Sequence, residues 1–166
     1  MRSNPAEARC LTGGEGQYCS HVEAARGRRE ERAEETGGGI LIIGTGIDHA
    51  RIDRIGHLLR RYPDRSRDRL FTDVERQACE SRPRAEECYA ARFAAKEAFV
   101  KALGTGLREG MRWTDIEIRT DRRGRPELGL HGAALRAFKQ AGGERAHLSF
   151  THEGGIAAAI VILEGT

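Results

Sequence analysis

The sequence of 166 residues lacks long apolar runs and has little lysine. No stretch approaches the roughly 20 apolar residues that a membrane-spanning helix needs. No apolar segment follows the first charges in the way a secretory signal requires. Three of the 28 basic residues are Lys, and the other 25 are Arg. We therefore expect one ordinary domain in the cytoplasm, without a membrane partner.

Cysteine is also too sparse to suggest a framework of disulfides or a zinc site. The four cysteines form neither a Cys-x-x-Cys motif nor a Cys/His cluster with zinc spacing, and Cys79 and Cys88 are nine residues apart. The pattern favours free thiols in a reducing compartment.

Residues 1–39 differ from the rest of the chain. They hold six Arg and seven Glu, contain almost no Ile, Leu or Phe, and end in three glycines. Such a segment cannot bury enough apolar surface to offset the entropy lost on ordering. We therefore predict a disordered tail over 1–39 and a folded domain over 40–166.

Hydrophobic periodicity and capping signals predict an α+β fold for that domain, with a mostly antiparallel sheet packed on one long helix. The predicted elements, in chain order, are a buried strand from Ile40 to Asp48, a helix over about 52–62 that Pro63 ends, a short helix from Thr72, a long helix over 83–103, strands over 113–120 and 128–130, a helix over 132–140, and a hairpin of strands over 146–151 and 156–163.

Charge is concentrated in one segment. The net charge of +3 is too small to indicate nucleic-acid binding, but residues 51–69 hold seven Arg against three Asp. A helix carrying Arg54, Arg60 and Arg61 is a candidate docking surface for an acidic partner. The alternatives are a merely solvated basic helix and an Arg-rich binding module without catalysis. We expect no nucleic-acid partner, since neither a zinc finger nor an aromatic-studded strand is visible.

Charged residues at four positions suggest chemistry on a phosphate. Asp48 closes the first predicted strand, where a carboxylate is costly unless it binds something or caps the next helix. Glu97 and Lys101 share one face of the long helix, with Arg92 nearby. The alternative for Glu97 and Lys101 is an exposed ion pair.

Two further motifs are weaker. Gly104, Thr105 and Gly106 form a turn whose backbone N–H groups can approach phosphate, although Gly104 also suits a helix C-cap. Ser149 and His152 suggest a nucleophile pair, but the Gly-x-Ser-x-Gly elbow of hydrolases is absent. Carboxylates for Mg²⁺ with Lys and Arg for phosphate together favour phosphoryl-type transfer on a diphosphate substrate.

These residues, taken together, resemble those of the holo-[acyl-carrier-protein] synthases, the short bacterial class of 4′-phosphopantetheinyl transferases. The most specific segment is the fifteen-residue run from Arg92 to Gly106. The remaining matching segments, in the family's order, are Gly46–Asp48 with Arg54, Phe71–Thr72 with Glu75, Trp113–Ile118, Gly124–Pro126 and His147–Glu153. The resemblance covers nearly all of 40–165 and none of the tail.

The resemblance implies an enzyme that transfers the phosphopantetheine arm of coenzyme A to a serine of apo acyl carrier protein. The second product would be adenosine 3′,5′-bisphosphate, and the pathway served would be fatty acid biosynthesis, a branch of lipid biosynthesis. A polyketide or nonribosomal peptide carrier is the alternative client. The family's short members are homotrimers with active sites between subunits, so we expect a homotrimer.

The resemblance also assigns roles to residues. Asp48 and Glu97 match the family's Mg²⁺ ligands, and with Lys101 and His152 they form the expected catalytic set. The expected coenzyme A contacts are Arg92, Lys101, Gly104, Thr105, Gly106, Pro126, Ser149 and His152. We favour a water on the metal over Glu97 as acceptor of the serine proton, because a carboxylate bound to Mg²⁺ is a poor base. The carrier is expected to dock on Arg54, Arg60 and Arg61.

The sequence departs from the family pattern at two places. His49 and Ala50 follow Asp48 where aliphatic residues are usual, and Ala50 lacks the extra acidic ligand of the larger transferases. Thr151 replaces the more usual Ser and keeps a hydroxyl. His49 alternates away from Asp48 along the strand, so we do not expect it to be a ligand.

Overall fold

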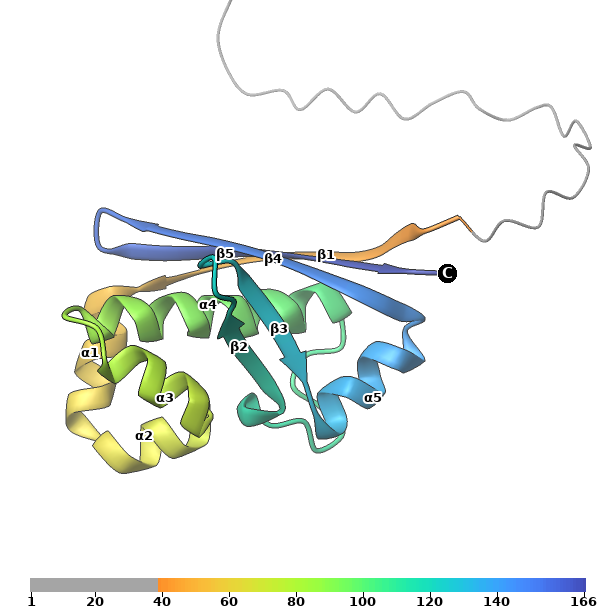
Figure 1. The fold of residues 1–166 in the computed structure, drawn as a ribbon. Helices are drawn as coiled ribbons and strands as arrows, with labels where there is room; N and C mark the ends of the chain where they lie inside the picture. The colour runs from red at the N-terminus through yellow and green to blue at the C-terminus, as the bar shows by residue number, and fades with distance from the viewer. Residues whose placement is uncertain (1–38) are drawn as a thin grey trace, which may run out of the picture. The chain divides into compact units, whose positions relative to one another are not determined.

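A computed structural model of the chain describes residues 39–166 and confirms the predicted α+β class (Figure 1). The predicted tail lies outside the described residues except for Gly39. The elements, in order, are β1 (Leu41–Arg51), α1 (Ile52–Arg61), α2 (Pro63–Leu70), α3 (Asp73–Glu80), α4 (Ala85–Leu103), a 3₁₀ turn (Trp113–Asp115), β2 (Ile116–Thr120), β3 (Pro126–Leu130), α5 (Gly132–Gln140), β4 (Gly143–Glu153) and β5 (Ile156–Gly165).

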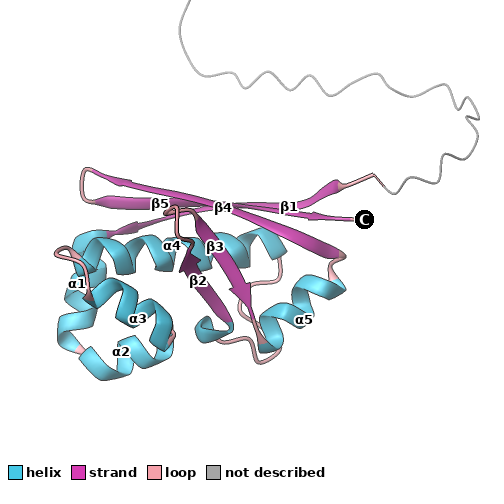
Figure 2. Ribbon diagram, in the orientation of Figure 1, coloured by secondary structure: helices cyan, strands magenta, loops and turns pink. Residues whose placement is uncertain are grey.

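The strands form two antiparallel sheets, and the helices lie on one side of the larger one. That sheet has the order β1-β5-β4, while β2 and β3 pair separately. Figure 2 shows α4 running along the inner face of the three-stranded sheet, with the other helices beyond it. None of the helices in the described part of the chain is long and apolar enough to cross a membrane.

Local signals in the sequence set several helix ends. Thr72 and Glu75 form the predicted capping box, in which the Thr72 N–H donates to Glu75 Oε2 at 2.8 Å and the Glu75 N–H donates to Thr72 Oγ1 at 3.4 Å. Gly104 ends α4 with φ of 71°, a left-handed conformation that glycine adopts without steric cost. The C-cap role considered for Gly104 is therefore confirmed.

The prediction for Pro63 was incomplete. The first helix ends at Arg61 as expected, but Pro63 then begins α2, which the sequence analysis missed. Proline is well suited to the first turn of a helix, because its missing N–H would have no partner there. The same residue therefore ends one helix and starts another.

Two glycines bring β1 against α4. A Cβ on Gly44 would collide with the backbone carbonyl of Ala102, and a Cβ on Gly46 with that of Ala98. Because neither glycine has a side chain, the strand lies directly on the helix. This approach places Asp48, two residues after Gly46, beside the second half of α4.

The expectation that the first strand is buried was wrong. Leu41 is 63% exposed and Ile42 is 64% exposed. The outer face of the three-stranded sheet has no helix on it in the described structure, and its exposed apolar side chains include Ile47 and Ile160. A run of β-branched residues indicates a strand, but it does not tell whether one or both faces are covered.

The expectation of free thiols was also wrong for one pair, because Cys79 and Cys88 form a disulfide. Cys79 lies in the last turn of α3 and Cys88 in the first turn of α4. The short turn between these helices folds α4 back onto α3 and brings the two sulfurs together. Cys10 and Cys19 lie outside the described residues.

A fully buried ion pair explains why Lys96 lies in the apolar stripe of α4. Lys96 Nζ donates to Glu75 Oε2 at 2.7 Å and to the carbonyl oxygens of Leu70 and Trp113. Burial lowers the pKa of Lys96, although the Glu75 carboxylate opposes that shift. Glu75 Oε1 accepts the Ile118 N–H at 3.0 Å, so the pair ties α4 to α3 and β2.

Candidate active site

Asp48 and Lys101 meet where β1 packs on α4. Lys101 Nζ donates to Asp48 Oδ1 at 2.6 Å and to the Ile47 carbonyl oxygen at 3.2 Å. Lys101 thus pairs across to the strand, rather than along the helix to Glu97 as the ion-pair alternative had it. Arg51 is the N-cap residue of α1, so Asp48 does not cap that helix.

The electrostatics link Glu97 to the same place. Partial burial raises the pKa of Glu97, the nearby Asp48 charge raises it further, and Lys101 opposes both. The hydrogen bond to Asp48 raises the pKa of Lys101. Two carboxylates that repel each other in a partly buried place form a site that a cation would stabilise.

Asp48 and Glu97 share a cavity of about 630 Å³, which we call the carboxylate cavity. Its wall is formed mainly by the end of β1 and by α1, with Phe93 and Glu97 from α4. The lining residues are Asp48, His49, Ala50, Arg51, Arg54, Ile55, His57, Leu58, Arg61, Tyr62, Phe93 and Glu97.

Mg²⁺ is the metal that the resemblance implies, and the donor set fits it. Mg²⁺ is commonly held by one or two carboxylates together with substrate phosphates. Asp48 and Glu97 supply two such carboxylates at one cavity. Residues 39–166 contain no group of three or more His, Cys, Asp and Glu side chains placed to hold a metal, so substrate oxygens and water would complete the coordination.

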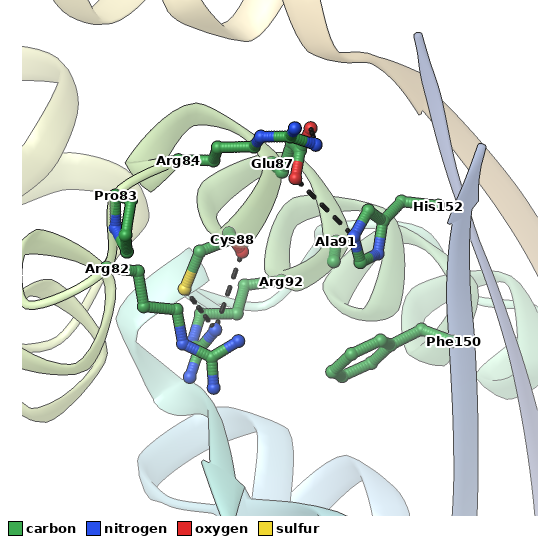
Figure 3. A pocket seen from close by; sticks show the side chains of 9 residues that line it. All are labelled: Arg82, Pro83, Arg84, Glu87, Cys88, Ala91, Arg92, Phe150 and His152. Atoms are coloured by element: carbon green, nitrogen blue, oxygen red, sulfur yellow. Dashed lines mark hydrogen bonds and ion pairs between the residues drawn. The ribbon is translucent and has the colours of Figure 1, made fainter. Parts of the chain in front are cut away.

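Arg92 and His152 line a different cavity, of about 280 Å³, which we call the arginine cavity (Figure 3). Phe150 and His152 project toward it from β4. The remaining lining residues belong to the turn before α4 and to the first half of that helix. They are Arg82, Pro83, Arg84, Glu87, Cys88, Ala91 and Arg92.

One cation of the arginine cavity, Arg92, is held firmly, whereas the Arg84 side chain is 78% exposed. Arg92 is only 2% exposed, and its Nη1 donates to Cys88 Sγ at 2.7 Å. Within the described part of the chain, the Arg92 Nε has no hydrogen-bond partner, which leaves a buried donor unsatisfied. Burial lowers the pKa of Arg92, but an arginine keeps its charge in proteins. His152 Nε2 lies 3.5 Å from Glu87 Oε2.

The glycine turn forms a third cavity, of about 460 Å³, which we call the glycine-turn cavity. Glu97 lines this cavity as well as the carboxylate cavity, so the two adjoin. Lys101, Gly104 and Gly106 also line it, whereas Thr105 does not. The other lining residues are Val100, Leu107 and Trp113.

Besides Thr105, two expected coenzyme A contacts lie outside these three cavities. Ser149 is exposed and alternates with Phe150 and His152, so it lies on the outer face of the sheet. Pro126 begins β3, where it pairs with Thr120.

The three arginines of α1 proposed for docking do not all lie at one cavity. Arg54 and Arg61 line the carboxylate cavity. Arg60 instead forms an ion pair with Glu86 at the start of α4. A docking role for Arg60 would have to compete with that pair.

Sequence reasoning missed several lining residues. His57 and Tyr62 line the carboxylate cavity, and Arg82 and Arg84 line the arginine cavity. A signal existed for the last two, because they flank the proline that precedes the long helix. No periodicity pointed to His57 or Tyr62.

Comparison with known proteins now adds the family. The model of the 4′-phosphopantetheinyl transferase superfamily matches residues 44–161, which include every lining residue of the carboxylate and arginine cavities. The chain belongs to this superfamily. This membership confirms the resemblance drawn from the sequence.

Relatives within the superfamily are similar over most of their length. A holo-[acyl-carrier-protein] synthase of Trichlorobacter lovleyi is 50% identical over 124 residues, covering 75% of this chain and 98% of the relative. A synthase from Bacillus anthracis, solved in complex with coenzyme A, has a TM-score of 0.62 at 36% identity, covering 75% of this chain and 98% of that one. One from Neisseria meningitidis has a TM-score of 0.68 at 33% identity, covering 74% and 98%.

Proposed function

We propose that this protein is a holo-[acyl-carrier-protein] synthase, which transfers the 4′-phosphopantetheine group from coenzyme A to a serine of apo acyl carrier protein. The observation that carries the proposal is the meeting of Asp48, Glu97 and Lys101 from β1 and α4 in a member of this superfamily. The names of the curated relatives and the coenzyme A complex of the Bacillus anthracis synthase support it.

Asp48 and Glu97 would hold Mg²⁺, which neutralises charge on the pyrophosphate and on the leaving adenosine 3′,5′-bisphosphate. Lys101 is 52% exposed at its side chain, so its ammonium can leave Asp48 and contact a substrate phosphate. Because its ion pair with Asp48 can open, Lys101 can provide a positive charge to an incoming phosphate. The glycine turn adjoins the same place and offers backbone N–H groups to phosphate oxygens.

The carrier serine must lose its proton as it attacks phosphorus. We assign that proton to solvent in the carboxylate cavity rather than to Glu97, because a carboxylate engaged with a cation is a weak base. Asp48 and Glu97 line a cavity large enough for both the serine and water.

The arginine cavity would hold a phosphate at the nucleotide end of coenzyme A. Arg92 presents a buried, unpartnered Nε, and a phosphate oxygen would satisfy it. His152 is positioned through Glu87 to add a second donor. These contacts bind and orient the substrate without taking part in bond breaking.

We also propose a homotrimer with its active sites between subunits. Among residues 39–166 of one subunit, no residue lines both the carboxylate cavity and the arginine cavity. The outer face of the β1-β5-β4 sheet carries Ile47, 68% exposed, and Ile160, 43% exposed. Packing this face against neighbouring copies would bury these two isoleucines. It would also bring one subunit's carboxylate cavity toward another's arginine cavity.

The client would be an acidic carrier protein of cytoplasmic fatty acid biosynthesis. Arg54 and Arg61 are at the carboxylate cavity, where the carrier serine must arrive. Opposite charges on the carrier would steer this encounter. A polyketide or peptide synthase carrier remains the second candidate, because it would present the same serine and acidic surface.

Mass spectrometry of the carrier tests the function directly. Purified protein, coenzyme A, Mg²⁺ and apo carrier should yield a carrier heavier by one phosphopantetheine, and a chelator should stop the reaction until Mg²⁺ is restored. Equal amounts of fatty acid and polyketide carriers in one reaction would rank the clients. The absence of a mass shift with every carrier type would refute the proposal.

A further inference from the structure

The Cys79–Cys88 disulfide closes a ring of chain that forms one wall of the arginine cavity. The ring spans the turn between α3 and α4. Four residues inside it line the cavity, and Cys88 itself lines it as well. These four are Arg82, Pro83, Arg84 and Glu87.

The disulfide also touches the buried arginine of the cavity. Arg92 Nη1 donates to Cys88 Sγ at 2.7 Å, and Figure 3 shows the two side chains facing each other. Arg92 Nη1 also makes a weaker hydrogen bond to the Cys88 carbonyl oxygen, at 3.5 Å. The position of the Cys88 sulfur therefore helps to set the position of the Arg92 guanidinium.

The two sulfurs differ in access. Cys79 is fully buried, whereas Cys88 is 5% exposed and lines the cavity. A small reagent that enters the cavity therefore reaches Cys88 first. Three arginines line the same cavity and stabilise negative charge there. They would therefore also stabilise the Cys88 thiolate that reacts in thiol–disulfide exchange.

We propose that Cys79 and Cys88 are a redox-modification site that controls phosphate binding in the arginine cavity. The disulfide state holds the cavity wall and Arg92 in the arrangement that accepts an anion, and the dithiol state releases them. The identity of the anion, a phosphate of coenzyme A, rests on the function proposed above.

A low-molecular-weight disulfide such as oxidised glutathione is the oxidant. The Cys88 thiol loses its proton and attacks one glutathione sulfur, which forms a mixed disulfide and expels one glutathione thiol. The Cys79 thiol then loses its proton and attacks the Cys88 sulfur, which expels the second glutathione thiol. In sum, two protein thiols are oxidised to one disulfide and one glutathione disulfide is reduced to two thiols.

Preorganisation gives the direction of the effect. In the dithiol form the turn carrying Arg82 and Arg84 loses its covalent closure, and Arg92 loses a fixed partner. An anion must then order these groups as it binds, which weakens its affinity. Since coupling between two sites is reciprocal, a bound nucleotide must favour the disulfide by the same factor.

The test uses the full chain with Cys10→Ser and Cys19→Ser, so that only the pair in question can react. The protein is equilibrated with oxidised glutathione or with a phosphine reductant. Mass spectrometry after alkylation reports the Cys79–Cys88 bond. Calorimetry with adenosine 3′,5′-bisphosphate as the probe reports affinity in each state.

We expect oxidised protein to bind the probe at least about 5-fold more tightly than reduced protein, the lower end of typical couplings between sites. In glutathione buffers of graded ratio, saturating probe should shift the thiol–disulfide equilibrium toward the disulfide by the same factor. A merely structural disulfide would change thermal stability without this matched shift.

Cys79→Ser provides the control, because Cys79 does not line the cavity. Under reducing conditions this variant should bind like the reduced protein. In oxidised glutathione it should stop at the mixed disulfide on Cys88, seen as one added glutathione mass, and should not gain affinity. Equal affinity in the two redox states, or failure of the bond to form in oxidised glutathione, would overturn the inference. Neither result would affect the proposed function, whose failure shows separately as a carrier of unchanged mass.

Discussion

The carboxylate cavity and the arginine cavity lie along the same helix, α4, but they differ in charge and in burial. The first presents two carboxylates beside the exposed Lys101, which is held by one ion pair. The second presents Arg92, which is almost completely buried. Exposed charge can exchange partners during a reaction, whereas buried charge keeps its place.

This difference suggests a division of labour. The carboxylate cavity has two repelling carboxylates and an exchangeable lysine, which suit catalysis, and the arginine cavity has a fixed cation, Arg92, which suits recognition. Changes in the first should therefore act mainly on kcat, and changes in the second mainly on KM for coenzyme A.

The largest effect is expected at the carboxylates. Glu97→Gln and Asp48→Asn should each lower kcat about 10²–10³-fold, the range for removing a group that stabilises transition-state charge. Carrier modification followed by mass spectrometry gives the rate, and circular dichroism checks the fold. Glu127→Gln, at an exposed position in β3, should leave both unchanged. A near-normal rate in either cavity variant would remove that residue from the metal site.

In the proposed trimer, packing of the outer sheet face should bring one subunit's carboxylate cavity to another subunit's arginine cavity. Ile160→Asp places a charge on the exposed apolar stripe and should yield monomers whose activity falls about 100-fold, because misplaced substrate groups cost that much. Sedimentation measures the assembly. Leu135→Asp on α5, a residue of similar exposure at 40%, should assemble and react normally. A fully active Ile160→Asp monomer would show that one subunit suffices.

A smaller effect, of a different kind, is expected in the arginine cavity. Arg92→Met should raise KM for coenzyme A about 10–100-fold, since a hydrogen bond to a charged group contributes about 1.5–3 kcal/mol. His152→Gln should act in the same direction. Steady-state kinetics with varied coenzyme A separates the parameters. A large loss of kcat with unchanged KM would contradict the division of labour.

The smallest effect is expected on α1. Arg54→Ala should raise KM for the carrier about 2–5-fold at low salt, as expected for an exposed ion pair of about 0.5–1 kcal/mol. Arg60→Ala is the matched control and should change it less, because Arg60 is paired with Glu86. Added salt should erase the difference between the two variants. An equal response would show that the Arg60 pair opens for the carrier.

Much of this fold was predictable because its signals are local. Pro83 and Gly104 bracket α4 to within two residues, and the capping box marks α3. The resemblance and the residue chemistry suggested that Asp48, Glu97 and Lys101 belong to one site, but not the direct ion pair between Asp48 and Lys101. By contrast, the helix that begins at Pro63 was not predicted, because a proline can end one helix as well as begin the next.

The misses depended on contacts between distant segments. Exposure of β1 depends on which sheet face the helices cover, and pairing of Cys79 with Cys88 depends on the turn between α3 and α4. Arg92 and Glu97 looked close in the sequence. Five residues along a helix place them about 140° apart around its axis at 3.6 residues per turn, so they face different cavities.

The most direct test of the account is to mix defects from the two cavities. Glu97→Gln and Arg92→Met subunits carrying different tags would be co-expressed, purified through both tags and assayed at low coenzyme A. If each site joins two subunits, one of the three sites in every mixed trimer should be intact, and activity should rise to about a third of wild type. Activity no higher than that of the separate variants would contradict an active site shared between copies of this chain.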